Sequence, residues 1–303
     1  MKPSRRDFIK TGSAAAVCGS ALLRSRELYA KTLNLPLGLQ LYSVRDLLPK
    51  DYQGTLKELS DLGYREVESA GYFNHSAAEV KQAMDSAKLK LVSAHYSLDS
   101  LHKQLDEILA FSKEVGVGHI VCSSPSIKDP SRLKAMKPQE RTHAFTLEDW
   151  HWNAKQLNAL GEKVHAAGLK FGYHNHFTEF HVTDGVVPYA ELMRLTDPAK
   201  VTMEMDCGWV VVGGGDPVEY LRKYPSRITM LHVKDFKHKD ASAAGEPVIA
   251  ELGQGSIDYR PVFEEAAKVG HLTHVFAEQE AFTVPPMESL KIDADYLRKL
   301  GLG

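Results

Sequence analysis

Short apolar segments alternate with longer amphipathic segments along most of the chain. Each apolar segment is short enough to form a single buried strand. The second one is entered through Gly63, and glycine is common at the border of a strand. The pattern predicts eight strands, at residues 36–42, 64–69, 90–95, 118–123, 169–174, 201–206, 228–232 and 273–278.

Between these strands, apolar residues recur with the spacing of a helix. Leu56, Leu59 and Leu62, for example, fall on one helical face. Ser76 followed three positions later by Glu79 is the capping-box pattern that begins a helix. The predicted helices cover residues 52–62, 76–89, 101–115, 146–167, 188–196, 216–224, 259–269 and 286–300.

Strands that alternate with helices pair in parallel, so the chain is predicted to have an α/β fold. Eight strand–helix units in about 270 residues match a (β/α)₈ TIM barrel. An open doubly wound sheet is the alternative, but it would place a glycine-rich turn after the first strand, and residues 42–46 contain no glycine. We therefore expect a single-domain barrel over residues 31–303.

The first thirty residues have the features of a targeting segment. Arg5 and Arg6 precede Phe8, Ile9 and Lys10, and a weakly apolar stretch follows. This order resembles the twin-arginine export signal of bacteria. It predicts that residues 1–30 are a signal peptide and that the protein is exported to the periplasm. An amphipathic helix with a chance arginine pair is the alternative.

Composition excludes several classes of protein. Hydrophobic residues make up 43% and charged residues 25% of the chain, which is ordinary for a folded soluble protein. The formal net charge of −2 argues against a nucleic-acid partner, which would require a basic surplus. No apolar run reaches the ~18 residues of a membrane span. Cys122 and Cys207 are expected to be buried free thiols.

The chemistry is expected at the carboxyl ends of the strands, where parallel barrels carry their functional residues. The last four predicted strands end in His174, Asp206, His232 and Glu278. One such residue alone is more often a hydrogen-bonding group or a helix cap. Four of them on neighbouring strands predict a single divalent metal ion, and their residue types suit Mn²⁺, Co²⁺, Mg²⁺ or Zn²⁺.

Further polar and aromatic residues lie near the same ends. Glu278, His174 and Lys234 are the candidate catalytic residues, although Lys234 could instead form an ion pair with Asp235 at the barrel rim. Tyr42, Trp152 and Trp209 could stack on a sugar ring or pack in the core. The candidate substrate-binding residues are Gln40, Tyr42, Glu68, His95, His176, Trp209, His238 and Glu280.

Several motifs occur in an order and spacing that is typical of one family. They are GLQLYSVRD (38–46), GYREVE (63–68), YHNH (173–176), MDCGW (205–209), LHVKD (231–235), GQGSIDY (253–259) and FAEQE (276–280). Over residues 36–300 the chain resembles the xylose isomerase-like TIM-barrel superfamily of sugar (phosphate) isomerases and epimerases. The resemblance implies one divalent ion held by Glu, Asp, His and Glu from strands five to eight. The last three correspond to Asp206, His232 and Glu278.

Two positions depart from that pattern. His174 stands where many relatives have the first glutamate, and an imidazole that binds metal is poorly placed to act as a base. Trp209 stands where ketose epimerases carry a substrate-binding histidine. The resemblance implies an isomerase or epimerase that acts on a keto-sugar through a metal-stabilised enediolate. Because β-elimination needs only one base, a 3-keto-glycoside lyase or hydratase is the alternative.

Other interpretations also remain open. A periplasmic sugar-binding protein would need neither a metal nor a base. A metal-independent hydrolase would use two of Glu68, Glu204 and Glu280 as a carboxylate pair. The basic insertion at residues 125–145 is long for a loop of this fold and could be a lid or an oligomer contact. We expect a small sugar substrate, free or glycosidic because of the predicted export, and a homo-oligomer is possible.

Overall fold

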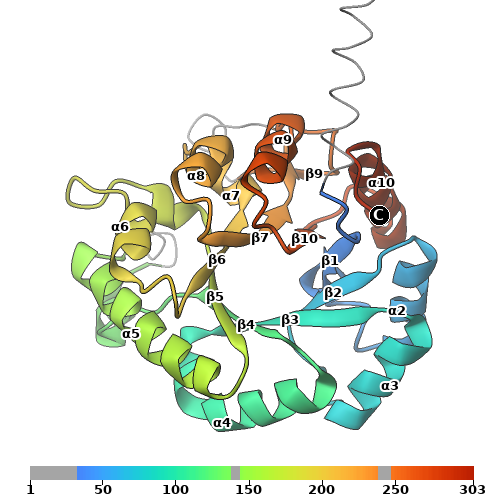
Figure 1. The fold of residues 1–303 in the computed structure, drawn as a ribbon, viewed down its shortest axis with the longest axis horizontal. Coiled ribbons are helices and arrows are strands. Elements are labelled where there is room, and N and C mark those ends of the chain that lie inside the picture. The colour runs from blue at the N-terminus through green and yellow to red at the C-terminus, as the bar shows by residue number, and fades with distance from the viewer. Residues whose placement is uncertain (1–32, 138–143, 238–246) are drawn as a thin grey trace, which may run out of the picture.

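The computed structural model describes residues 33–137, 144–237 and 247–303. The predicted signal peptide and His238 lie outside the described residues. Eight parallel strands close into a barrel in the order β1-β10-β7-β6-β5-β4-β3-β2, which confirms the predicted fold (Figure 1). The strands are β1 (Gly38–Gln40), β2 (Glu66–Ser69), β3 (Lys90–Ser97), β4 (His119–Ser124), β5 (Lys170–His174), β6 (Thr202–Asp206), β7 (Ile228–Val233) and β10 (His274–Ala277).

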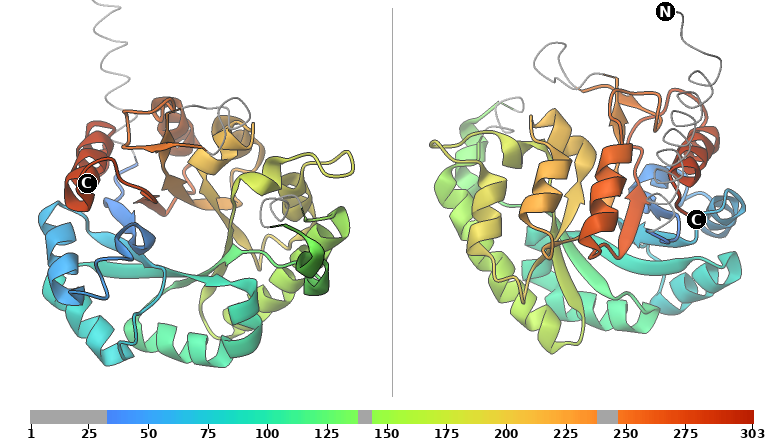
Figure 2. Two further views of the ribbon diagram at one scale, coloured as in Figure 1. Left: turned by 180° about the vertical axis from the view of Figure 1, so that it is seen from behind. Right: turned by 45° about the horizontal axis from the view of Figure 1, so that its top comes forward.

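Helices form an outer ring around these strands (Figure 2). They agree with the predicted segments to within a few residues at each end. The capping box at the start of α3 is present, with the Glu79 amide and the Ser76 side chain paired as predicted. The helices of the ring are α2 (Tyr52–Asp61), α3 (Ala77–Ala87), α4 (Leu98–Val115), α5 (Leu147–Ala166), α6 (Pro188–Leu195), α8 (Pro217–Lys223), α9 (Arg260–Val269) and α10 (Pro286–Lys299).

The structure also contains short elements that the sequence pattern does not predict. Helix α7 (Cys207–Val212) follows β6 directly, and a small antiparallel pair, β8 (Asp235–Phe236) and β9 (Ile249–Ala250), follows β7. The first strand is shorter than predicted because the chain turns into a 3₁₀ helix at Leu41–Val44. Elements this short contain too few residues to show a hydrophobic period.

Apolar side chains fill two separate regions. The larger core lies between the barrel and the helices and includes Cys122 and Cys207, which are buried free thiols as expected. A smaller apolar cluster consists of Val92, Val121, Met230 and Phe276. Met230 and Phe276 lie two residues before His232 and Glu278 on their strands, so successive inward positions change from apolar to polar toward the carboxyl end.

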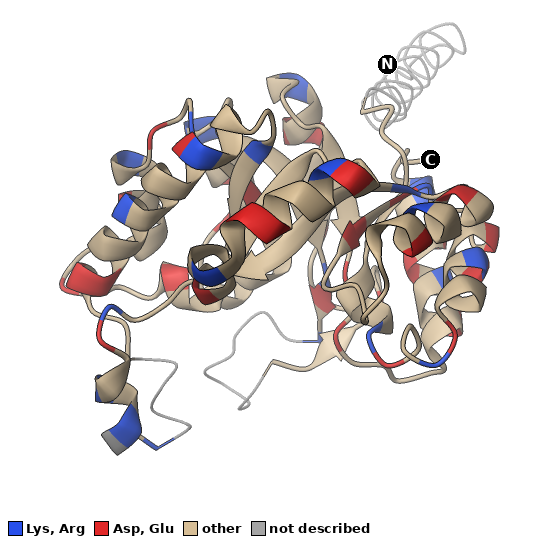
Figure 3. Cartoon of the chain, turned by 90° about the horizontal axis from the view of Figure 1, so that it is seen from below, with Lys and Arg blue, Asp and Glu red and all other residues tan. Residues whose placement is uncertain are grey.

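The outer surface carries both signs of charge. Figure 3 shows basic and acidic residues interspersed along the helices of one face. Many of them form exposed pairs within one helix, such as Lys57–Asp61 and Lys291–Asp295, each worth at most about 1 kcal/mol. Among the described helices, none combines the length and the apolar character that crossing a membrane requires.

Candidate active site

The four predicted metal ligands come together at the carboxyl end of the barrel. His174 ends β5, Asp206 ends β6, His232 lies near the end of β7 and Glu278 follows β10. One ligand atom from each lies within 4.8 Å of the others, and all four residues are buried. The strand-end rule of parallel barrels therefore places all four side chains correctly.

Hydrogen bonds fix the carboxylate of Asp206 in this group. Its Oδ1 accepts a hydrogen bond from the Trp209 amide at 2.8 Å, because Asp206 is also the N-cap of α7. Its Oδ2 lies 3.0 Å from the Lys234 ammonium and 3.8 Å from His174 Nε2. The Asn175 side chain pairs with the Asp206 backbone through both its amide nitrogen and its oxygen. One oxygen of Asp206 is thereby held by the backbone, and the other faces the charged and imidazole groups of the site.

Burial sets the charge of these groups. Burial and the neighbouring His232 lower the pKa of His174 well below its usual value, so this imidazole is neutral. Burial also raises the pKa of Asp206 to about 6, although Lys234 opposes the shift. Burial likewise opposes ionisation of Glu278, but Lys234 and His232 hold its pKa well below the usual range. Two imidazoles and two carboxylates are a donor set that fits a divalent ion.

The Lys234 ammonium is held inside this group. Its Nζ lies 3.0 Å from Asp206 Oδ2 and 2.9 Å from Glu278 Oε2, and it also pairs with Glu280. Gly208 makes room for it, since a Cβ there would lie 2.4 Å from Lys234 Cγ. Asp235 instead accepts hydrogen bonds from four backbone amides in and after the β8–β9 pair. Lys234 therefore faces the site and does not form the alternative ion pair with Asp235 at the barrel rim.

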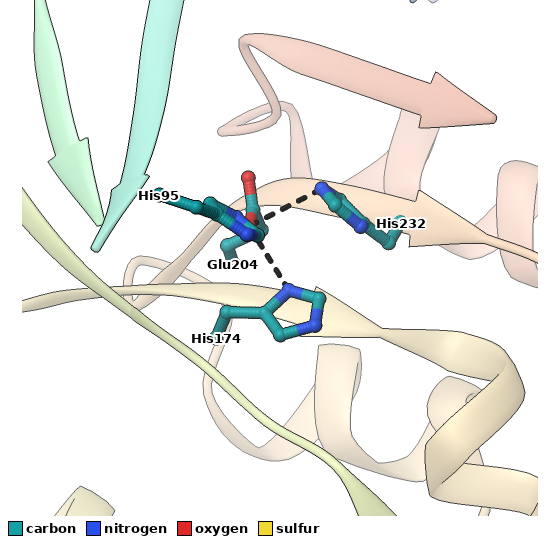
Figure 4. A group of neighbouring side chains, drawn as sticks. All are labelled: His95, His174, Glu204 and His232. Carbon is teal, nitrogen blue, oxygen red and sulfur yellow. Dashed lines mark hydrogen bonds and ion pairs between the residues drawn. The ribbon is translucent and has the colours of Figure 1, made fainter. Parts of the chain in front are cut away.

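A second group of titratable side chains lies deeper in the barrel. It contains His95, Glu204 and the far nitrogens of His174 and His232, all within 4.8 Å of one another (Figure 4). Burial alone would lower the pKa of His95. The carboxylates of Glu68 and Glu204 have the larger combined effect and raise this pKa to about 9. Burial and Glu68 raise the pKa of Glu204, but His232 and His95 outweigh them and hold it at about 2. The deep group therefore contains the imidazolium of His95 beside the ionised carboxylate of Glu204.

A cavity of about 350 Å³ opens beside the predicted ligands. Four of the expected substrate-binding residues line it, namely Tyr42, His95, His176 and Glu280. Burial, followed by the effect of Lys234, lowers the pKa of His176 to about 3, so its ring is neutral at the cavity wall. The full lining is Tyr42, Ala70, His95, Tyr96, Ser97, Ser123, Ser124, His174, His176, Glu278 and Glu280.

Three other expected substrate-binding residues do not line this cavity. Gln40 and Glu68 are fully buried and bond to each other at 2.8 Å. Trp209 packs against Phe236 and Phe177, with ring centroids 5.0 and 5.4 Å apart. Each of the three side chains is enclosed by protein atoms, so the geometry gives no support for its contact with substrate.

Sequence reasoning named Glu204 only for the hydrolase alternative, and it did not select the serines and Tyr96 on the cavity wall. The sequence did contain an indication that Glu204 faces the site. It lies two residues before Asp206, and every second residue of a strand points to the same face. Ser97, Ser123 and Ser124 lie where β3 and β4 end, but serine is too common at such positions to indicate a site. The carboxylate-pair hydrolase also loses support, because Glu68 and Glu204 both lie beneath the cavity at His95 Nε2.

The comparison with family models identifies the fold family. Residues 56–300 match the family described as "Xylose isomerase-like TIM barrel". The chain belongs to this family. The resemblance drawn from the sequence motifs is thereby confirmed.

Relatives within and around the family differ in their named reactions. An inosose dehydratase of Lacticaseibacillus casei is 26% identical over 250 residues, which cover 76% of this chain and 82% of the relative. A solved sugar phosphate isomerase/epimerase of Parabacteroides distasonis ATCC 8503 is 27% identical with a TM-score of 0.70, covering 87% of this chain and 97% of that one. A solved structure of the IOLI protein with a zinc atom has a TM-score of 0.68 at 13% identity, with coverage of 88% of this chain and 98% of that one. The last match shows the fold alone. Together the matches support an enzyme.

Proposed function

We propose that the protein is a metal-dependent lyase that removes water, or another β-oxygen substituent, from a keto-sugar or cyclic keto-polyol. The observation that carries the proposal is the imidazole of His174 at the end of β5. Glu278 is then the only ligand carboxylate on the cavity wall among the described residues, whereas the epimerases that the sequence resembles use two metal-binding glutamates, one on each face of the substrate. The similarity to inosose dehydratases supports the same reaction type.

His174, Asp206, His232 and Glu278 would hold the metal. Their fit rests on the grouping of their four ligand atoms within 4.8 Å of one another and on the neutral ring of His174 described above. A divalent ion bound there supplies Lewis-acid polarisation of the substrate carbonyl. The zinc in the IOLI structure is consistent with such an ion.

Two imidazoles outside the ligand set are placed to move protons. His95 and His176 both line the cavity, and their rings lie 4.8 and 5.1 Å from the His174 ring. In the proposed reaction His176 accepts the proton from the carbon next to the carbonyl. His95, which contacts Glu68 and Glu204, donates a proton to the departing oxygen, so that hydroxide leaves as water.

The cavity favours an uncharged polyol over a sugar phosphate. Hydroxyl groups of Tyr42, Tyr96 and three serines can hydrogen-bond to a polyol, and Glu278 and Glu280 would repel a phosphate. No lysine or arginine contributes to the lining within the described parts of the chain. An unphosphorylated substrate is also what the predicted export would require.

The reaction type can be decided by incubation in deuterated water. Metal-loaded enzyme would be offered inososes, 3-keto-glycosides and free ketoses, and the products analysed by mass spectrometry and NMR. We expect loss of one water or of the aglycone, with an unsaturated ketone as product. Deuterium next to the carbonyl of an otherwise intact sugar would instead establish the isomerase/epimerase alternative, to which the Parabacteroides structure is similar. Binding of sugar without any turnover would favour a sugar-binding protein.

Substitution of His176 tests the proposed base. We expect His176→Gln to lower kcat about 10²–10⁴-fold, the usual contribution of a general base, while metal affinity stays unchanged. His151→Gln is the control, because His151 is a partly exposed histidine of α5 that pairs with Glu191 at 3.0 Å, away from the cavity. Equal kcat in wild type and His176→Gln would remove His176 from the mechanism.

We also propose that residues 1–30 direct export. Replacing Arg5 and Arg6 together by lysine should leave the precursor in the cytoplasm, because the arginine pair is the recognised part of a twin-arginine signal. Cell fractionation and immunoblotting would measure the periplasmic yield, and an export substrate of the general secretory route serves as the control. An unchanged periplasmic yield would contradict the proposal.

A further inference from the structure

Three imidazole nitrogens converge on one carboxylate oxygen deep in the barrel. Glu204 Oε2 lies 2.6 Å from His95 Nε2, 3.0 Å from His174 Nδ1 and 3.2 Å from His232 Nε2. Figure 4 shows the three rings arranged around this carboxylate. Each of the two ligand rings thus has one nitrogen directed at Glu204 and the other directed at a predicted metal ligand. The second nitrogen is Nε2 in His174, toward Asp206, and Nδ1 in His232, toward Glu278.

Glu68 supplies a second carboxylate to the same network. Its Oε2 lies 2.6 Å from His232 Nε2 and 2.9 Å from His95 Nε2. The Gln40 amide and the Ser93 hydroxyl donate to its two oxygens at 2.8 and 2.5 Å. Glu68 is therefore held rigidly, and its position fixes the far side of the His232 ring.

The distances between these atoms are those of hydrogen bonds. Here the nitrogens approach the carboxylate oxygens to 2.6–3.0 Å, which is the range of charge-assisted hydrogen bonds. The oxygen of Glu204 itself occupies the point on which the nitrogens converge.

The direction of these bonds determines the tautomers of the two rings. An ionised carboxylate has no proton to give, so the imidazole nitrogens must donate. His174 then carries its proton on Nδ1, and His232 carries one on Nε2. The lone pair of the neutral His174 ring is consequently on Nε2, the nitrogen directed toward Asp206. His232 also donates from Nδ1 to Glu278 at 2.9 Å, and this nitrogen becomes available to an ion when that proton is lost.

We propose that Glu204 and Glu68 are positioning residues of the metal site, which select the nitrogen that His174 and His232 each present to the ion. The inference rests on the metal site of the proposed function. Carboxylates behind metal-bound histidines fix ring orientation and raise ligand basicity, and their loss typically weakens metal binding 10–100-fold. Nothing in this role requires Glu204 or Glu68 to touch the substrate.

The tautomers can be read directly in the wild-type protein. Zinc-loaded chain with ¹⁵N-labelled histidine would be measured by long-range ¹H–¹⁵N correlation, which distinguishes protonated from unprotonated ring nitrogens. We expect the proton of His174 on Nδ1 and that of His232 on Nε2. The opposite assignment for either ring would overturn the proposal, and this measurement does not depend on a variant that folds.

Zinc affinity of variants provides the second measurement. Glu204→Gln and Glu68→Gln should each weaken zinc binding 10–100-fold in a competition titration, with the wild-type stoichiometry of one ion per chain. Glu66→Gln is the matched control, because Glu66 is a buried carboxylate of the same strand β2 that bonds to His274 at 2.6 Å, outside the ligand set. Its zinc affinity should stay within about 2-fold of wild type.

Other outcomes separate this inference from the proposed function. Wild-type affinity in both variants, or two zinc ions per wild-type chain and one in Glu204→Gln, would overturn the inference, and the second result would make the deep group an ion site. A wild-type protein that binds no zinc and no manganese would overturn the metal site itself. Tautomers measured on the metal-free chain would then still decide whether Glu204 accepts from His174 Nδ1.

Discussion

Removal of the metal by a chelator should abolish turnover and lower the melting temperature by roughly 10 °C. An ion that binds only the folded state stabilises it by about 4 kcal/mol at a thousand times its Kd. For a domain of this size, 1 kcal/mol corresponds to about 2–4 °C. The buried ligand atoms of Asp206 and Glu278 exist as a group only in the folded barrel, so the unfolded chain cannot compensate.

The measurement pairs an activity assay with differential scanning calorimetry before and after exhaustive chelation. Adding back Mn²⁺ or Zn²⁺ should restore both properties. Asp206→Asn is the informative variant, since its melting temperature should be low and should no longer respond to the chelator. Turnover that survives complete removal of metal would refute the proposed mechanism.

Replacement of Lys234 by methionine should destabilise the metal-free protein by about 3–5 kcal/mol. The lysine is 1% exposed and faces three carboxylates, those of Asp206, Glu278 and Glu280. Removing one partner of a buried ionic group leaves the opposite charges uncompensated, and this cost exceeds the loss of a surface pair several-fold. Urea denaturation of the metal-free variant would measure the change in free energy of unfolding.

Lys90→Met is the control for this experiment. Its side chain is 73% exposed and lies 3.9 Å from Glu66, so its removal should cost less than about 1 kcal/mol. In the metal-loaded protein the cost of Lys234→Met should shrink, because the ion compensates Asp206 and Glu278. Equal small losses for both variants would mean that the Lys234 ammonium does not balance the buried carboxylates.

The fold was predictable because its signals are long and repeated. Each strand is a short apolar run beside an amphipathic helix such as 147–166, and eight repeats of that pair leave few alternatives to a closed parallel barrel. Helix α7 was not predicted because its six residues do not complete two turns, so no helical spacing of apolar residues can be seen in it. The β8–β9 pair has only two residues per strand, so no alternation can be seen in it.

The site was only partly predictable, for a physical reason. Strand-end position places His174 and Asp206 at the chemical face, but it does not give their depth. Glu68 also occupies a strand end, yet hydrogen bonds to Gln40 and Ser93 hold it beneath the cavity. Trp209 looks like a sugar-stacking ring in the sequence, whereas α7 turns it into an aromatic cluster with Phe236. Such differences depend on side-chain packing, which strand order alone does not specify.

The pairing of the first strand, β1, with the last, β10, closes the barrel and determines when the site can be assembled. β1 pairs with β10 through Gly38↔Phe276 and Leu39↔Ala277, and Ser43 accepts a hydrogen bond from the Gln279 amide 236 positions away in the chain. During translation one edge of β1 therefore remains unpaired until the last strand leaves the ribosome. Exposed strand edges can pair with other chains and promote aggregation. Glu278 follows that strand directly. Nascent chains consequently lack a complete set of the proposed ligands, so a metal ion bound by that set would stabilise the protein only after synthesis of the barrel has finished.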